Sequence, residues 1–350
     1  MDPNSLKALQ GAAGSDAWAG DPVIAVGHDN SPYVSVYPWD AGFGTKYANP
    51  ATLPAGPVYG CAFSPDGRDL ALAHYNTPWL SVYPWSSSSG FGTKYTNPST
   101  LPPGNCEDVA FSPDGAYLAV AGYDAAGGSE ISVYPWSSGF GTKYADPGTA
   151  PNGTGRGLGW SPDTANIALG HDSIPYAAVY PWSSSGFGTK YANPSTLPGG
   201  HGRGVAWSPD GADIAIAHTS DPRFSVYSWS SGFGTKYSNP ATKPAWDGFV
   251  PRWSPDGADL ALGHQDSPGI AVYPWSSGFG TKYVNPGTTP TGHGYGMAWS
   301  ADGTDLAVVH NSSPYVTAYP WSSGFGTKYA DPSTLPPGTA IGVAFSPAGV

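Results

Sequence analysis

The six residues GFGTKY, first found at Gly42–Tyr47, occur seven times in this 350-residue chain. Successive copies begin 48, 49, 47, 46, 46 and 46 residues apart. Such regular self-similarity means that each repeat is one piece of a shared core, so chain length does not predict two or three separate domains. The remaining copies begin at Gly90, Gly139, Gly186, Gly232, Gly278 and Gly324.

Each repeat contains four segments that are typical of β-strands. In the unit that begins at Val205, these segments are VAWS, ADIAIAH, FSVYSW and TKYSN, and SPDG, TSDP and SSGFG separate them. Short β-branched and aromatic segments bounded by Gly, Pro, Asp and Ser indicate strands joined by tight turns. No segment shows sustained helical periodicity. We therefore expect an all-β protein built from seven four-stranded units.

The composition favours a packed protein rather than a disordered one. Glycine (49 residues) and proline (38 residues) are abundant, but so are tryptophan (14), tyrosine (22) and phenylalanine (12). Each buried aromatic side chain removes about 150 to 250 Å² from water. The chain has only two cysteines, Cys61 and Cys106, so neither a disulfide framework nor a zinc-binding pattern is expected. Core packing must therefore stabilise the fold.

The segment VAFSPDGAYLAVAGY at Val109–Tyr123, followed by ISVYPW at Ile131–Trp136, resembles a blade of a WD40-type β-propeller. The longer string YPWSSGFGTKYANPSTLP also resembles the near-identical propeller repeats of tailed-phage virion proteins. The resemblance implies seven blades of four antiparallel strands. It also implies a virion-associated location; without it the sequence leaves the location unknown.

The order of the strand signals predicts how the ring closes. The chain begins on a second-strand signal near Ile24 and ends on an innermost-strand signal centred on Phe345. We expect the C-terminal strand to pair with the N-terminal blade, and we favour this over the alternative that Trp18 marks the missing innermost strand. Residues 1–20 are expected to be a linker or a cloning-derived segment, and residues 21–350 a single propeller domain.

The motifs give no sign of a cofactor or a catalytic set. GFGTKY superficially resembles a phosphate-binding loop, but such loops join a strand to a helix, whereas GFGTKY lies between two strands. A net charge of −11 opposes nucleic-acid binding, and no apolar run is long enough to cross a membrane. Repeats place like groups on a circle, whereas acid–base catalysis needs unlike groups at one point. We therefore expect no enzyme activity, no cofactor and no metal.

The best candidates for a site are positions at which the repeats differ. One position lies four residues before the aromatic residue of each innermost strand, and a second lies two residues earlier still. In a propeller this segment borders the central channel, on the face called the top. In the seven repeats, the first position is occupied by Tyr59, Glu107, Arg156, Arg203, Phe249, Tyr295 and Ile341. The predicted ligand-binding cluster consists of Arg156, His201, Arg203, Trp246, Asp247, His293 and Tyr295.

A second set of top-face residues follows the turn between the second and third strands. Aromatic side chains there would either stack against a glycan or fill the seam between blades. We favour the seam and keep glycan stacking as the alternative. The residues are Tyr33, Trp79, Tyr176, Phe224 and Tyr315.

Taken together, the sequence predicts a non-enzymatic binding or structural module, associated with the tail or capsid surface of a phage virion. The alternatives are a carbohydrate-binding propeller of lectin type and an intracellular protein-interaction scaffold of WD40 type. The expected partner is a protein or a surface glycan, with no nucleic acid and no membrane, and the domain is expected to be monomeric.

Overall fold

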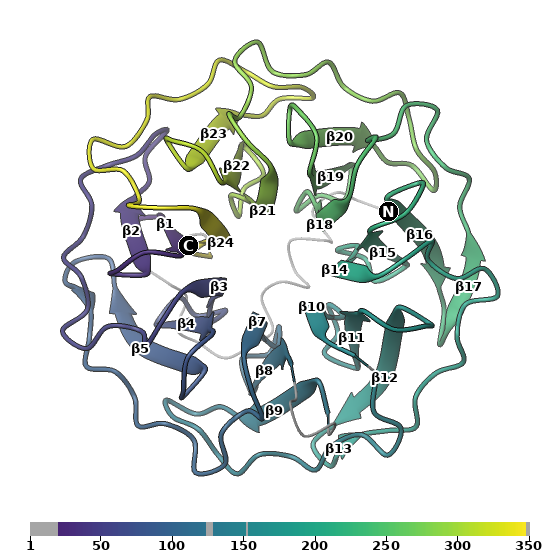
Figure 1. Ribbon diagram of the computed structural model, residues 1–350, viewed down its shortest axis with the longest axis horizontal. Coiled ribbons are helices and arrows are strands. Elements are labelled where there is room, and N and C mark those ends of the chain that lie inside the picture. The colour runs from purple at the N-terminus through teal and green to yellow at the C-terminus, as the bar shows by residue number, and fades with distance from the viewer. Residues whose placement is uncertain (1–19, 124–128, 152, 348–350) are drawn as a thin grey trace, which may run out of the picture.

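The computed structural model describes residues 20–123, 129–151 and 153–347. Its strands form seven separate sheets, each antiparallel, and no helix occurs in these residues. The sheets are arranged as blades around a centre, which the strands β3, β7, β10, β14, β18, β21 and β24 surround (Figure 1). The described chain is thus an all-β protein with the seven sheets of a seven-bladed propeller.

The blades are numbered here along the chain. Blade 1 contains β1 (Val23–His28), β2 (Val34–Pro38) and β24 (Ala340–Phe345), and blade 2 contains β3 (Val58–Phe63), β4 (Asp69–His74), β5 (Leu80–Ser86) and β6 (Gly90–Phe91). Blade 3 contains β7 (Cys106–Phe111), β8 (Tyr117–Gly122) and β9 (Ile131–Pro135), and blade 4 contains β10 (Gly155–Trp160), β11 (Asn166–His171), β12 (Ala177–Ser183) and β13 (Gly186–Phe187).

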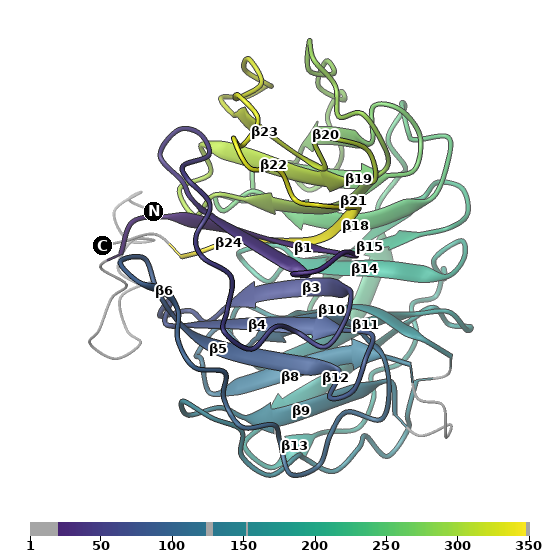
Figure 2. The same ribbon diagram turned by 60° about the vertical axis from the view of Figure 1, so that its left-hand side comes forward.

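Blade 5 contains β14 (Gly202–Trp207), β15 (Asp213–His218), β16 (Phe224–Trp229) and β17 (Phe233–Lys236). Blade 6 contains β18 (Gly248–Trp253), β19 (Asp259–His264) and β20 (Ile270–Pro274), and blade 7 contains β21 (Gly294–Trp299), β22 (Asp305–His310) and β23 (Val316–Pro320). Viewed from the side, neighbouring blades lie next to one another with their strands roughly aligned (Figure 2).

The first blade is made from both ends of the described chain. Strand β24 pairs antiparallel with β1, from Ile24 opposite Phe345 to His28 opposite Ala340. The Ser346 hydroxyl also accepts a hydrogen bond from the Val23 amide, at 3.0 Å. Trp18, the alternative source of this innermost strand, lies outside the described residues.

The prediction of four strands in every blade is wrong for four blades, where the fourth segment forms only one isolated bridge. A proline near the end of the third strand keeps the fourth strand short, since in the two other blades that have it, at Pro84 and Pro181, the fourth strand has only two residues. The Pro38 carbonyl accepts a hydrogen bond from the Gly44 amide. In a regular antiparallel ladder, the backbone nitrogen of Pro38 would in turn donate a hydrogen bond to Gly44. Because proline has no amide hydrogen, the ladder loses a bond there. In blade 5 the equivalent residue is Ser228, and its fourth strand β17 is the longest, with four residues.

The GFGTKY segment is a structural hairpin, as predicted. Its phenylalanine packs edge-on against the tryptophan of the same blade: the ring centroids of Phe43 and Trp39 are 5.0 Å apart. Its lysine binds a side chain three residues later, as Lys46 does with Asn49. This Lys–Asn or Lys–Asp contact recurs at Lys94, Lys143, Lys190, Lys236, Lys282 and Lys328.

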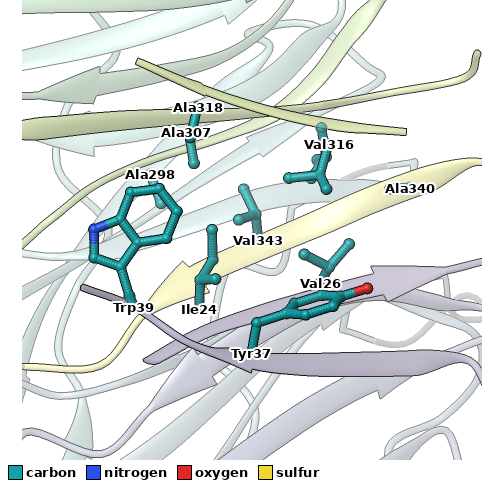
Figure 3. Close-up of a cluster of buried hydrophobic side chains, with 11 residues drawn as sticks. Ile24, Val26, Tyr37, Trp39, Ala298, Ala307, Val316, Ala318, Ala340 and Val343 are labelled. Atoms are coloured by element: carbon teal, nitrogen blue, oxygen red, sulfur yellow. The ribbon is translucent and has the colours of Figure 1, made fainter. Parts of the chain in front are cut away.

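The core lies in the seams between blades. In the seam of blades 7 and 1, Ile24, Val26 and Trp39 face small side chains such as Ala298 and Ala307 (Figure 3). Six similar clusters of buried apolar residues occupy the other seams. Each blade is therefore stabilised mainly by its two neighbours.

A buried carboxylate joins blades at four seams. Asp69 of blade 2 accepts hydrogen bonds from the Trp136 indole of blade 3 and from the Tyr95 hydroxyl, both at 2.9 Å. Asp213, Asp259 and Asp305 accept the corresponding indole bond at 2.9 to 3.0 Å. At the other three seams the aspartate is absent: Asn166 takes its place at one, and at the other two the indole nitrogens of Trp85 and Trp182 have no acceptor among the described residues.

A histidine ends the second strand of six blades and stands 11 residues before the blade tryptophan. The spacing suggests a pair with that tryptophan, but in four blades the ring is hydrogen-bonded to a hydroxyl seven residues later, at 2.9 to 3.1 Å. Burial lowers the pKa of these histidines to about 4. They are therefore neutral structural groups at pH 7. The pairs are His28 with Ser35, His74 with Ser81, His218 with Ser225, and His310 with Thr317.

Candidate functional site

A cavity of about 420 Å³ lies at the centre of the ring, and residues from all seven blades line it. The rim position that varies between repeats supplies one lining residue from each blade, as the sequence predicted for this segment. Each of these residues belongs to an innermost strand, which places its side chain at the same level of the ring. They are Tyr59, Glu107, Arg156, Arg203, Phe249, Tyr295 and Ile341.

Glu107 is the centre of a hydrogen-bonded cluster in this cavity. Its Oε1 atom accepts a bond from the Tyr75 hydroxyl at 2.6 Å and another from Nη1 of Arg156 at 3.0 Å. Burial raises the pKa of Glu107 above its ordinary value, although Tyr75 and Arg156 act in the opposite direction. Glu107 is thus a more basic carboxylate than one in water.

Arg156 lies between two carboxylates. Its Nη2 atom is 2.8 Å from Oδ2 of Asp172, and its Nη1 atom is 3.0 Å from Oε1 of Glu107. Burial alone would raise the pKa of Asp172, but the bond and charge of Arg156 hold it below the usual range. Arg156 is therefore committed to carboxylates of the protein and has little capacity left for a ligand.

Arg203 is placed differently from Arg156. No carboxylate oxygen of the described residues lies within salt-bridge distance of it, and its buried Nε atom has no acceptor there. Its positive charge nevertheless lowers the pKa of Glu107 and of Asp172. Arg203 is therefore the cation of the rim that remains available to a ligand.

A second pair of charges lies among the cavity residues. The two carboxylate oxygens of Asp108 accept bonds from the amides of Val109 and Leu158, at 2.9 and 3.0 Å. Burial raises the pKa of Asp108, and the charge of Arg252 opposes this effect. Burial also disfavours the charged form of Arg252 and so lowers its pKa, whereas the charge of Asp108 raises that pKa. The pair therefore balances its own charge inside the cavity.

The other side of the rim is mostly aromatic. The rings of Phe249 and Tyr295 are 5.0 Å apart, and the rings of Tyr59 and Tyr75 are stacked at 4.1 Å. Ile341 lies between them in the order of the blades. At the rim position, blades 6, 7, 1 and 2 thus present ring faces and an aliphatic side chain, opposite the charged residues of blades 3 to 5, while Asp29 and Arg252 line the cavity from other positions.

The structure brings together only part of the predicted cluster. Arg156, Arg203 and Tyr295 line the cavity, whereas His201, Trp246, Asp247 and His293 do not. The last four belong to the loops that lead to the innermost strands, where the side chain of His201 is 54% exposed and Trp246 is 61% exposed. Asp247 lies 3.7 Å from Arg223, and His293 contacts the Tyr295 hydroxyl.

The predicted top-face aromatic set also needs a correction. Tyr33, Trp79 and Tyr315 are half-buried and pack against seam clusters, while Tyr176 is half-buried beside His201. Phe224 is only 1% exposed, so it has no face to offer a glycan. The residue that follows the turn proline in blade 5 is Arg223, which has the same positive φ as its equivalents in other blades.

The sequence reasoning missed Tyr75, Asp108 and Arg252. The same comparison of repeats contains a signal for each of them. Arg252 stands where other blades have alanine or glycine, Asp108 stands mostly where they have glycine, and Tyr75 follows the repeated histidine at a variable position. Three of the five arginines in the chain line this one cavity.

Within the described residues, no group of three or more His, Cys, Asp or Glu side chains is placed to hold a metal ion. The same part of the chain contains no helix with the length and apolar character needed to span a membrane.

No protein-family model matches the chain, and a comparison with curated proteins gave no match. Solved structures are similar in fold. A proposed 6-phosphogluconolactonase from Bacteroides uniformis has 17% sequence identity and a TM-score of 0.71, over 93% of this chain and 99% of that one. The periplasmic gluconolactonase of Pseudomonas aeruginosa has 17% identity and a TM-score of 0.67, over the same shares of the two chains. A proposed 6-phosphogluconolactonase from Bacteroides fragilis has 11% identity and a TM-score of 0.65, over 95% and 99%.

These similarities support a β-propeller and show neither a WD40 nor a phage-virion relationship. They also contradict the prediction of a non-enzymatic module, because the similar structures bear the names of lactone-hydrolysing enzymes. The error lay in the argument that repeats place only like groups on a circle. At the rim the blades contribute five residue types, and a carboxylate and two arginines, Glu107, Arg156 and Arg203, line one cavity.

Proposed function

We propose that the chain hydrolyses a lactone in the central cavity. One observation carries the proposal: Glu107, a carboxylate whose pKa burial raises, lines the central cavity together with Arg203, an arginine that has no carboxylate partner among the described residues. Ester hydrolysis needs a base for water and a positive group for the oxyanion that develops on the carbonyl. The names of the similar propellers support the same reaction class.

In this mechanism Glu107 removes a proton from water, and the water oxygen forms a bond with the carbonyl carbon of the lactone. Arg203 stabilises the negative charge that develops on the carbonyl oxygen. The bond between the carbonyl carbon and the ring oxygen then breaks, and the proton held by Glu107 passes to that oxygen. The product is a hydroxy acid, and its carboxylic proton is released to water at neutral pH.

Tyr75 and Arg156 position the base in this reaction. Both donate to Oε1 of Glu107, so none of the hydrogen bonds of the cluster occupies Oε2. The second oxygen is therefore free to accept the proton of a water molecule. Because both donors favour the ionised form, they limit how far burial raises the pKa of Glu107.

The test is acid release from lactones, followed with a pH indicator at pH 7 and corrected for spontaneous hydrolysis. A panel should contain glucono-δ-lactone and dihydrocoumarin. Glu107→Gln removes the base while retaining a group that can accept from Tyr75, and the loss of a general base lowers kcat by about 10² to 10⁴. Asp221→Asn is the matched control, because Asp221 is an exposed acid that does not line the cavity.

The proposal predicts hydrolysis by the unmodified protein and by Asp221→Asn, and loss of activity in Glu107→Gln with an unchanged melting temperature. It is wrong if no lactone of the panel is hydrolysed faster than in buffer, or if Glu107→Gln is as active as the unmodified protein.

A further inference from the structure

The rim of the cavity is divided into two continuous arcs, and this division bears on the substrate. Blades 3, 4 and 5 contribute Glu107, Arg156 and Arg203, which we call the charged arc. At the same rim position, blades 6, 7, 1 and 2 contribute the apolar arc, which consists of Phe249, Tyr295, Ile341 and Tyr59. Two charged residues of these blades, Asp29 and Arg252, also line the cavity but do not belong to the rim position. At the level of the rim, a ligand therefore meets mostly charge on one edge and mostly ring faces on the other.

The protein itself already uses most of the polar groups of the charged arc. Glu107 accepts from Tyr75 and Arg156, and Arg156 also binds Asp172. Asp108, which follows Glu107 in the chain and also lines the cavity, accepts hydrogen bonds from two backbone amides. A polyhydroxylated sugar ring would lose its hydrogen bonds to water on entry, and few protein groups could replace them. This cost counts against a sugar lactone.

A flat, apolar ring would lose few hydrogen bonds to water on binding, and the apolar arc offers it favourable contacts. Phe249 and Tyr295 lie 5.0 Å apart in a tilted pair, and both line the cavity. Aromatic rings prefer offset or edge-to-face contacts with other rings, and such contacts add to the gain from burying apolar surface. An aryl ring on this arc would displace water without leaving hydroxyl groups unsatisfied.

Arg203 supplies the positive contact that such a ligand needs, whereas the other buried cavity atom without a partner among the described residues, Oδ1 of Asp29, is an acceptor and would repel an oxyanion. The buried Nε atom of Arg203 has no acceptor in the described part of the chain. A guanidinium donates two parallel bonds to a carboxylate, and a hydrogen bond to an ionised partner is about twice as strong as one between neutral groups. One oxyanion at Arg203 would satisfy this donor.

We infer that the cavity takes an aryl lactone, a lactone ring fused to or carrying a flat apolar ring, and that it holds the aryl carboxylate that hydrolysis produces. The aryl ring lies against Phe249 and Tyr295, and the carbonyl, later the carboxylate, lies at Arg203. This inference rests on the proposed function for the reaction, whereas the binding of the product tests it separately.

The experiment compares two substrates and their two products. Dihydrocoumarin and glucono-δ-lactone are compared by kcat/KM, and 3-(2-hydroxyphenyl)propanoate and gluconate are compared by isothermal titration calorimetry. We expect the aryl lactone to be hydrolysed with the higher kcat/KM and the aryl acid to bind more tightly than gluconate. Phe249→Ser should weaken the binding of the aryl acid about tenfold, because it removes an aromatic contact. Arg203→Gln should weaken it by a similar factor or more, because it removes a charge-assisted bond.

The outcomes separate the inference from the proposed function. If neither lactone is hydrolysed but the aryl acid binds and depends on Arg203, the assigned ligand class stands and the activity is wrong. If glucono-δ-lactone has the equal or higher kcat/KM, or if gluconate binds as tightly as the aryl acid, the ligand class is wrong. Binding of the aryl acid that Phe249→Ser and Arg203→Gln leave unchanged would also overturn it. Lys243→Gln, at an exposed top-face cation outside the cavity, is the control for Arg203→Gln.

Discussion

Four buried histidines should make the fold sensitive to mild acid. His28, His74, His218 and His310 have a pKa of about 4 in the folded protein, because burial disfavours the charged ring. In an unfolded chain a histidine has a pKa of about 6.5. The unfolded state therefore binds more protons between pH 6.5 and 4, so the free energy of unfolding falls as the pH falls through this window.

The size of the effect follows from the pKa difference. A difference of about 2.5 units corresponds to about 3 kcal/mol for each histidine at pH 4 and below. Within the window, each histidine adds a slope of about 1.4 kcal/mol per pH unit, and four together add about 5. Burial raises the pKa of Asp69, Asp213 and Asp259 above 3.8, so these carboxyls act in the opposite direction between that value and their raised pKa, toward the acid end of the histidine window.

The assay is urea unfolding, followed by tryptophan fluorescence at intervals between pH 7.5 and 4.5. His74→Gln removes one titrating ring and retains a donor that can reach Ser81, so the slope should decrease by about 1.4 kcal/mol per pH unit. Ser81→Ala removes the partner and retains the ring, so it should lower stability at every pH without abolishing that slope. An identical slope in His74→Gln and the unmodified protein would refute the reasoning.

Three further predictions concern the seams, a turn and the site. Asp69→Ala leaves an indole and a hydroxyl donor without their acceptor, so the free energy of unfolding should decrease by about 2 to 4 kcal/mol. Asp40→Ala, at an exposed aspartate, is the control and should change it little. Equal effects of the two substitutions in denaturant unfolding would contradict this prediction. Gly269→Ala should destabilise the fold by about 1 kcal/mol or more, because φ is 77° and a Cβ atom would lie 2.6 Å from the Gly292 carbonyl oxygen. Gly287→Ala, with nothing within 4 Å of the added carbon, is its control in thermal unfolding. Tyr75→Phe removes a hydrogen bond that lowers the pKa of Glu107, so the acid limb of the pH profile of kcat/KM should move to higher pH; an unmoved limb would show that Glu107 is not the titrating base.

The sequence predicted the fold better than the site. The seven GFGTKY copies and the strand signals between them were enough for seven antiparallel units, because the turn residues of each repeat are nearly invariant. The fourth strands could not be predicted from segment count alone, since the proline at Pro38 and its equivalents removes a ladder hydrogen bond. In blade 5, where Ser228 replaces this proline, the fourth strand extends to four residues.

The rim of the site could be located but not completed. Comparison of the repeats identified the seven rim residues, all of which line the cavity. It could not show that Tyr75, from another strand end, reaches Glu107, because that contact depends on the packing of blade 2 against blade 3. For the same reason it could not separate Arg203, which is without a carboxylate partner among the described residues, from Arg156, which has two.

The sparse pairing of the fourth segments has a consequence for how the molecules behave together. An exposed, regular edge strand offers a row of unpaired amides and carbonyls that a second chain can extend, which is a common route to aggregation. A ring of seven blades has seven outer edges, so this hazard is repeated seven times around one molecule. In four blades the outermost segment forms a single bridge and otherwise only separate backbone bonds to the third strand, such as the bond from Tyr47 to Val36, and so irregular an edge is a poor template for another strand. Blade 5 has the most regular outer edge, and replacing Ser228 with proline there should make the protein less prone to associate at high concentration.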